Sequence, residues 1–221
     1  PYTTIQYALD APSTRHGDTI AVMPGTYQET LHFTGQAVTV QSMDGPEVTI
    51  IDASRQGSVV SFTNYARTGN ALASPILRGF TLTGGSGTAW KDMRSGGGVF
   101  VVDATAGLED CILAGNRAAL GAGVFSDGGT VTLLGCTLRD NIAGTKYRLQ
   151  DGHGGAVYAR GGAVGLNQTV VLSNKAGRGA GLYLDGARLD AVKSKVLANV
   201  TEVRDLHGHP GEGGGLYAHG A

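Results

Sequence analysis

The 221-residue chain is poor in charge, in cysteine and in long apolar runs, and each shortage excludes a class of protein. Only 16% of the residues are charged and the formal net charge is −1, which argues against a general electrostatic attraction to nucleic acid or to an anionic membrane surface. No apolar run approaches the roughly 20 residues that a membrane-spanning helix needs. Two cysteines cannot form a zinc site by themselves. We therefore expect no nucleic-acid partner and no membrane span in this segment.

Glycine, by contrast, is abundant, with 37 residues, and it recurs in a repeat. Two small residues, an aliphatic residue and an aromatic residue follow one another at 97–100, 122–125, 155–158, 180–183 and 214–217. An asparagine stands 16 residues after each of the first four aromatics: Asn116, Asn141, Asn174 and Asn199. This constant interval indicates an ordered repeat rather than a disordered glycine-rich segment.

The repeat predicts an all-β fold. A short helix is expected at 3–10, and strands are expected at 19–23, 37–41, 48–51, 58–62 and 76–82. In each repeat, alternating apolar positions predict two strands, and the aromatic segment makes a third. Three strands in a minimal coil of about 25 residues predict a right-handed parallel β-helix, a solenoid in which equivalent residues of successive coils stack as ladders.

The domain organisation follows from the same pattern. We expect a single β-helix domain over 1–221, with an N-terminal cap at 1–12, irregular first coils at 17–85 and regular coils at 96–221. The chain stops within a repeat, so we expect an apparently truncated C-terminal end whose open strand edges favour self-association.

Two columns of equivalent residues have structural interpretations. The four asparagines are expected to form a ladder that pairs amide to amide along the axis. Cys111 and Cys136 occupy one repeat position and predict two buried thiols in neighbouring coils, although strands about 4.8 Å apart also leave a disulfide open.

The interval from asparagine to the next aromatic is variable, and it alternates between long and short. It is 9 residues after Asn116 and Asn174, but 17 after Asn141 and 18 after Asn199. The three long segments are 86–97, 143–154 and 201–213. We expect them to line one flank of the solenoid as a wall. They carry the candidate ligand-binding residues: Trp90, Asp92, Arg94, Tyr147, Arg148, Asp151, His153, Arg204, Asp205 and His207.

The same segments hold the candidates for catalysis and for metal binding. Arg94, Arg148, Arg204 and His153 are the groups that could move a proton or neutralise a uronate. Asp205, His207 and His209 are the candidate metal ligands, because imidazole and carboxylate suit zinc. We predict no cofactor, with Zn²⁺ or Ca²⁺ as the alternative.

A further column stands two residues after the aromatics. Asp127, Arg160 and Asp185 are expected to stack on consecutive coils as an exposed ladder of alternating charge. A glycosidase would need paired carboxylates on one face, and a pair two coils apart with an arginine between does not favour that chemistry.

Two groups of segments resemble known families. GDTIAVMPGTYQETLHF at 17–33, preceded by TIQYALDA, resembles the opening coils of the pectin-lyase-like right-handed β-helix superfamily. GGAVY at 154–158 and CTLRDNIA at 136–143 resemble the repeats of bacterial surface β-helices, among them the polymorphic outer-membrane proteins of chlamydiae.

The resemblance covers nearly the whole chain and implies an extracellular or bacterial cell-surface protein. It does not fix an activity, because this fold carries lyases, hydrolases, esterases, epimerases and adhesins. The pattern of two aspartates and an arginine that marks pectin methylesterases is not recognisable in the sequence.

Three functional hypotheses follow. The first is a surface or extracellular module that binds polysaccharide, or another surface protein, through the three long segments. The alternative is a polysaccharide-active enzyme, a lyase or an epimerase, with its site on the same wall. The third hypothesis is a structural stalk or filament segment.

Overall fold

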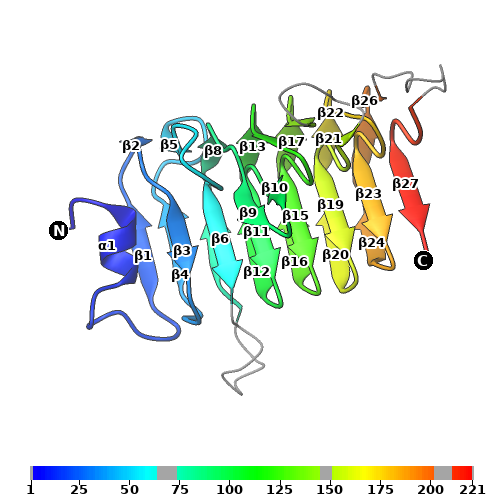
Figure 1. The fold of residues 1–221 in the computed structure, drawn as a ribbon. Coiled ribbons are helices and arrows are strands. Elements are labelled where there is room, and N and C mark those ends of the chain that lie inside the picture. Colours follow the sequence, from blue (N-terminus) through cyan, green and yellow to red (C-terminus); the bar gives the residue numbers. More distant parts are fainter. Residues whose placement is uncertain (1, 64–73, 145–150, 202–210, 221) are drawn as a thin grey trace.

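The computed structural model describes residues 2–63, 74–144, 151–201 and 211–220. They form a right-handed parallel β-helix in which successive coils stack along one axis, from the N-terminal helix to the last strand (Figure 1). Each coil gives one strand to each of three parallel sheets, and every one of these sheets has seven strands. The fold class predicted from the repeat is therefore confirmed.

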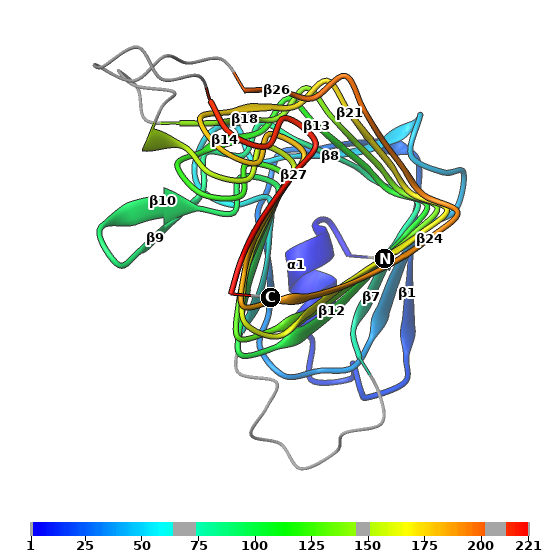
Figure 2. The same cartoon turned by 90° about the vertical axis from the view of Figure 1, so that its right-hand side faces the viewer.

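Helix α1, Ile5–Leu9, covers the first coil. Thr4 caps its N-terminus by accepting a hydrogen bond from the Tyr7 backbone, and the Glu29 carboxylate accepts from the backbone of Ile5 and Gln6 at 3.0 and 2.9 Å. Ile5 and Leu9 are buried in the interior of the solenoid, and Figure 2 shows the helix within the outline of the coils. The helix is shorter than the predicted span 3–10 but it has the predicted apolar face.

The first and second sheets contain the two apolar strands of each repeat. The strands of the first sheet are β1 (Thr19–Val22), β4 (Thr39–Ser42), β7 (Ile76–Arg78), β12 (Thr105–Glu109), β16 (Thr130–Leu134), β20 (Ala163–Asn167) and β24 (Arg188–Val192). Those of the second are β2 (Gly25–Tyr27), β5 (Thr49–Asp52), β8 (Thr81–Thr83), β13 (Ile112–Ala114), β17 (Thr137–Arg139), β21 (Val170–Leu172) and β25 (Lys195–Leu197).

The third sheet contains the aromatic strands. It consists of β3 (Leu31–Phe33), β6 (Val60–Thr63), β11 (Val99–Val102), β15 (Val124–Asp127), β19 (Val157–Arg160), β23 (Leu182–Asp185) and β27 (Leu216–His219). Four coils add a two-residue strand to a short parallel sheet: β14 (Arg117–Ala118), β18 (Ile142–Ala143), β22 (Lys175–Ala176) and β26 (Val200–Thr201). One coil instead carries an antiparallel hairpin of β9 (Thr88–Trp90) and β10 (Met93–Ser95).

One predicted strand is wrong in its extent. The span 76–82 is two strands, β7 and β8, because the chain turns at Gly79 from the first sheet into the second. Gly79 has φ of 76°, a left-handed conformation that favours glycine, and this corner separates the two strands.

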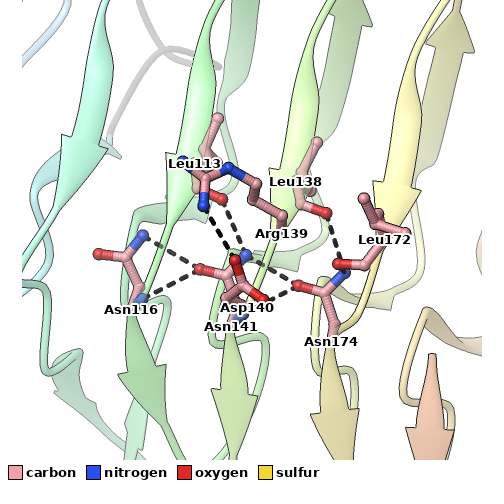
Figure 3. Close-up of polar contacts among 8 residues, drawn as sticks. All are labelled: Leu113, Asn116, Leu138, Arg139, Asp140, Asn141, Leu172 and Asn174. Atoms are coloured by element: carbon pink, nitrogen blue, oxygen red, sulfur yellow. Dashed lines mark hydrogen bonds and ion pairs between the residues drawn. The ribbon is translucent and has the colours of Figure 1, made fainter. Parts of the chain in front are cut away.

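The predicted asparagine ladder is confirmed (Figure 3). The side-chain amide of Asn116 donates to Oδ1 of Asn141 at 3.2 Å, Asn141 donates to Asn174 at 2.9 Å, and Asn174 donates to Asn199 at 2.9 Å. The backbone N–H of each of these three donors also reaches the same acceptor, so every rung joins two coils by two bonds. Asn116, Asn141 and Asn174 are fully buried. The ladder satisfies buried donors at the corner between the second sheet and the short sheet.

Cys111 and Cys136 are both free and buried, in neighbouring coils, as predicted. Their thiols donate to the carbonyls of Leu77 and Leu108, both at 3.4 Å. Among the described residues, no helix is long and apolar enough to cross a lipid bilayer.

Candidate functional site on the outer face of the third sheet

The aromatic residues of the repeat form a column on the outside of the solenoid. Val99 and Val101 point into the core, so Phe100 between them points outward, and the later coils repeat this alternation. Phe100, Phe125, Tyr158, Tyr183 and Tyr217 stack face to face, with successive ring centroids 5.5, 5.4, 5.1 and 4.8 Å apart. Because each ring covers the next, the column is a second apolar core and not a set of free stacking platforms.

The hairpin β9–β10 projects outward from the coils (Figure 2), and its Trp90 packs against the start of this column. Lys91 and Asp92 form its two-residue turn, with φ of 46° and 69°, the conformation of a type I′ turn. Trp90 pairs with Met93 across the hairpin, and its indole meets the Phe100 ring edge-on at a centroid distance of 5.8 Å. The ammonium of Lys91 lies 5.3 Å from the centre of the same indole.

Beside the aromatics runs a polar column, two residues further along each strand. Asp127, Arg160, Asp185 and His219 are register partners on successive strands of the third sheet. The order of alternating charge predicted from the sequence is therefore confirmed. The hairpin reaches this column as well, because Nε1 of Trp90 donates to Oδ2 of Asp127 at 3.0 Å.

Asp127 is the centre of a network of donors. Arg160 donates to both carboxylate oxygens, with Nε 3.0 Å from Oδ1, and Nζ of Lys91 lies 3.2 Å from Oδ2. Partial burial would raise the pKa of Asp127, but the hydrogen bonds from Arg160, Trp90 and Lys91 outweigh it and hold that pKa below its ordinary value. The carboxylate is therefore ionised at neutral pH and fixed in orientation.

His153 lies on the other side of the aromatic column. Its imidazole stacks on Tyr183, with ring centroids 4.7 Å apart and planes 6° from parallel. Burial lowers the pKa of His153, the positive charge of Arg178 lowers it further, and Asp151 opposes these effects. The imidazole is therefore neutral at neutral pH. Leu120, His153, Arg178 and Glu212 form a line of parallel bridges across successive coils, and Arg178 pairs with Glu212 at 3.4 Å.

Comparison with known proteins gives likeness in structure only. No family model matches the chain and no curated protein matches it. A crystal structure of a pectin methylesterase in complex with a hexasaccharide aligns with a TM-score of 0.51 and 12% identity, over 86% of this chain and 62% of that one. A pectin methylesterase from Aspergillus niger, in deglycosylated form, aligns with a TM-score of 0.40 and 13% identity, over 91% of this chain and 84% of that one. The chain has the pectin-lyase-like fold. At these identities the likeness concerns the fold alone, and the chain spans less than two thirds of the first esterase.

Within this pectin-lyase-like fold, the predicted site residues separate into groups. Trp90 lies on the outer face of the third sheet, and His153 lies beside it, with Asp151 exposed nearby. Asp92 is exposed in the hairpin turn. Nη1 of Arg94 donates to the carbonyl of Gly87 at 2.8 Å, which braces the base of the hairpin. The remaining candidates lie outside the described residues: Tyr147, Arg148, Arg204, Asp205, His207 and His209.

The sequence placed Trp90 and Asp127 in unrelated groups. The sequence pattern predicts a loop at 86–97 and so gives no sign of their contact, whereas the structure has a hairpin there that folds back over the next coil. The alternation of Thr88-Ala89-Trp90 and Met93-Arg94-Ser95 around two residues is a hairpin signal, but the turn lacks the asparagine or glycine that makes such a signal strong.

The structure also bears on metal binding. Among residues 2–63, 74–144, 151–201 and 211–220, no three His, Cys, Asp or Glu side chains converge to hold a metal ion. The proposed ligands Asp205, His207 and His209 lie outside these ranges, so a metal site there stays a prediction.

Proposed function

We propose that the chain is an extracellular or cell-surface module that binds polysaccharide on the outer face of the third sheet. The observation that carries the proposal is the fixed group of Trp90, Asp127 and Arg160, in which side chains from three coils meet at one carboxylate. Such a group presents donors and acceptors in a set geometry, so little conformational entropy is lost when a ligand binds.

The arrangement of the face suits an extended, repetitive ligand. Asp127, Arg160, Asp185 and His219 follow one another at the strand spacing of a sheet, about 4.8 Å. The strands beneath them are rigidly paired, so the polar groups keep this spacing. A polymer of sugars that runs along the solenoid can offer hydroxyl groups to several coils in turn.

The comparison supplies a precedent. The esterase structure with a TM-score of 0.51 was solved with a hexasaccharide, so a protein of this fold holds an oligosaccharide. The identity of 12% transfers no residue from that protein, and the support therefore concerns the class of ligand only.

Binding of purified protein to a glycan array tests the proposal. Trp90→Ala removes the indole that covers Phe100 and bonds Asp127, and Trp90→Phe keeps an aromatic ring but lacks the N–H. We expect the folded Trp90→Ala variant to lose most glycan retention and Trp90→Phe to lose part of it.

Arg160→Gln and Arg139→Gln form a matched pair. Both arginines are half-exposed partners of an aspartate, but Arg139 pairs with Asp140 on the second sheet. Loss of binding in Arg160→Gln with normal binding in Arg139→Gln supports the assignment of the face. Binding that survives in Trp90→Ala and Arg160→Gln alike refutes it.

A second candidate function is catalysis on polysaccharide, as a lyase or an epimerase. His153 favours it, because a neutral imidazole beside a tyrosine and an arginine can accept a proton from a sugar carbon. Incubation with acidic polysaccharides and detection of unsaturated or epimerised products tests this function. If the wild type forms product and His153→Ala does not, the protein is an enzyme; if neither forms product, this candidate is rejected.

A further inference from the structure

Within the part of the chain that the structure describes, the polar column holds one carboxylate that makes no hydrogen bond and no ion pair. Arg160 stands between Asp127 and Asp185 in the register of the third sheet, so its guanidinium could pair with either carboxylate. It directs its guanidinium to Asp127 alone, with bonds to both oxygens. Among the described residues, Asp185 has no hydrogen-bond or ion-pair partner. The strand β23 places it half-exposed on the outer face.

The lysine and arginine side chains that the structure describes on this face are already engaged. Lys91 and Arg160 pair with Asp127, and Arg178 pairs with Glu212. Arg94 donates to a carbonyl at the base of the hairpin. A ligand carboxylate would therefore have to displace an existing contact of one of these side chains, and the carboxylate of Asp185 would repel it.

The surroundings of Asp185 are rich in hydrogen-bond acceptors. Asp185 stands two residues after Tyr183 on β23, and Tyr158 is the register partner of Tyr183 on β19, so the carboxylate and the two phenol groups share one face of the sheet. Tyr158 has its pKa raised to about 12, so its oxygen stays protonated and uncharged at neutral pH. Arg160, the register partner of Asp185, gives its hydrogen bonds to Asp127, so the carboxylate of Asp185 and the hydroxyl oxygens beside it are left to accept from a group with several N–H donors and a positive charge.

We propose that the polysaccharide recognised by this face carries free amino groups, and that Asp185 binds one of its ammonium groups. This inference rests on the proposed function and names the chemistry of its ligand. Asp127 and Arg160 then contact neutral hydroxyls of neighbouring sugars, and Asp185 distinguishes an amino sugar from an acetylated or acidic one.

Calorimetric titration with three oligomers of equal length tests the inference. The probes are a β-1,4-linked glucosamine oligomer, its fully N-acetylated form as the neutral control, and an oligogalacturonate. The titrations are made at mildly acidic pH, where the amines are protonated and carboxylates with a pKa of about 4 remain ionised. We expect the glucosamine oligomer to bind most tightly and the oligogalacturonate most weakly.

Asp185→Asn keeps the side-chain shape and removes the charge. We expect it to weaken binding of the glucosamine oligomer about fivefold, near the upper end for one partly exposed charge pair, and to leave the acetylated oligomer unchanged. Asp190→Asn is the control for charge, because Asp190 is an exposed aspartate on β24, the next strand along the chain, where it pairs with Arg188 at 3.0 Å on the first sheet. It makes the same change in net charge and should affect none of the three oligomers.

Tighter binding of the oligogalacturonate, or an equal effect of Asp185→Asn on all three probes, overturns the inference while the proposed function stands. If no oligomer binds the wild type, which is folded by circular dichroism, the inference fails; if the glycan array shows no retention either, the proposed function fails with it.

Discussion

Replacement of Asn141 by alanine should cost about 4 kcal/mol of stability, because the side chain makes four buried hydrogen bonds of about 1 kcal/mol each. Its Oδ1 accepts from the backbone and the side chain of Asn116 at 3.1 and 3.2 Å. Its Nδ2 donates to the carbonyl of Leu113 and to Oδ1 of Asn174, both at 2.9 Å. Alanine leaves all four partners in place with 0% exposure of the site to water, so the loss is not offset by hydration.

Urea denaturation followed by far-ultraviolet circular dichroism measures this cost. A native domain is stable by roughly 5–15 kcal/mol, so a loss of this size shifts the midpoint strongly. Asn167→Ala is the matched control, because Asn167 is an exposed asparagine on β20, and we expect a change within about 0.5 kcal/mol. A solenoid can unfold in parts, so hydrogen exchange at Asn116 and Asn174 should report the local loss as well.

Asn199 gives a graded comparison within the same ladder. It accepts two bonds from Asn174 and donates one to Val171, but it is only half-buried. Asn199→Ala should therefore cost clearly less than Asn141→Ala. If the two cost the same, or if Asn141→Ala costs less than about 1 kcal/mol, the ladder is not a main source of stability and the reasoning fails.

Three further outcomes are expected. Gly85→Ala should unfold the protein or destabilise it severely, since a Cβ there would lie 1.9 Å from the carbonyl oxygen of Gly97, whereas Gly57→Ala, with nothing within 4 Å, should be tolerated in thermal melts. Because the pKa of Asp127 is lowered in the folded state, the ionised carboxylate stabilises the fold above the unfolded pKa of about 3.9, and this stabilisation is lost as pH falls through the folded value. Asp127→Asn should therefore flatten the acid side of the plot of unfolding free energy against pH. An unchanged acid side contradicts this. Neither thiol should react with Ellman's reagent until denaturant is added, because Cys111 and Cys136 are 0% and 1% exposed; fast labelling of the native protein would show that the coils open there.

The repeating part of the fold could be predicted from the sequence because its signal is repeated. The 16-residue interval from Phe100 to Asn116 recurs in four coils, and a ladder requires equivalent residues at equivalent positions. The alternating charge of Asp127, Arg160 and Asp185 followed from the same alignment of coils. The interval between equivalent residues in the sequence thus gives the coil to which each residue belongs, and a single sequence shows this interval directly.

Contacts that cross between columns could not be predicted in this way. The orientation of the aromatics depends on which of two alternating sets faces the interior, and Val99 and Val101 are as apolar as Phe100. The hairpin of β9 and β10 occurs once, so no repetition marks it, and its turn at Lys91 and Asp92 lacks the Asn-Gly or Asp-Gly pair that is typical of such turns. What remained hidden was therefore the part of the site that is unique to one coil.

This division indicates where specificity can arise in the solenoid. A ladder repeats one contact at each coil, so it can hold a polymer but cannot fix where along the axis the polymer starts. The hairpin breaks that equivalence, because Trp90 and Lys91 engage Asp127 in one coil while Asp185, two coils on, has no such cover. Phenylalanine occupies the aromatic column beneath the hairpin and tyrosine occupies it beyond, in step with the change from buried Phe125 to half-buried Tyr183. In the proposed binding mode, a ligand that needs an open carboxylate is thereby directed to the tyrosine end of the face, and the hairpin sets the register.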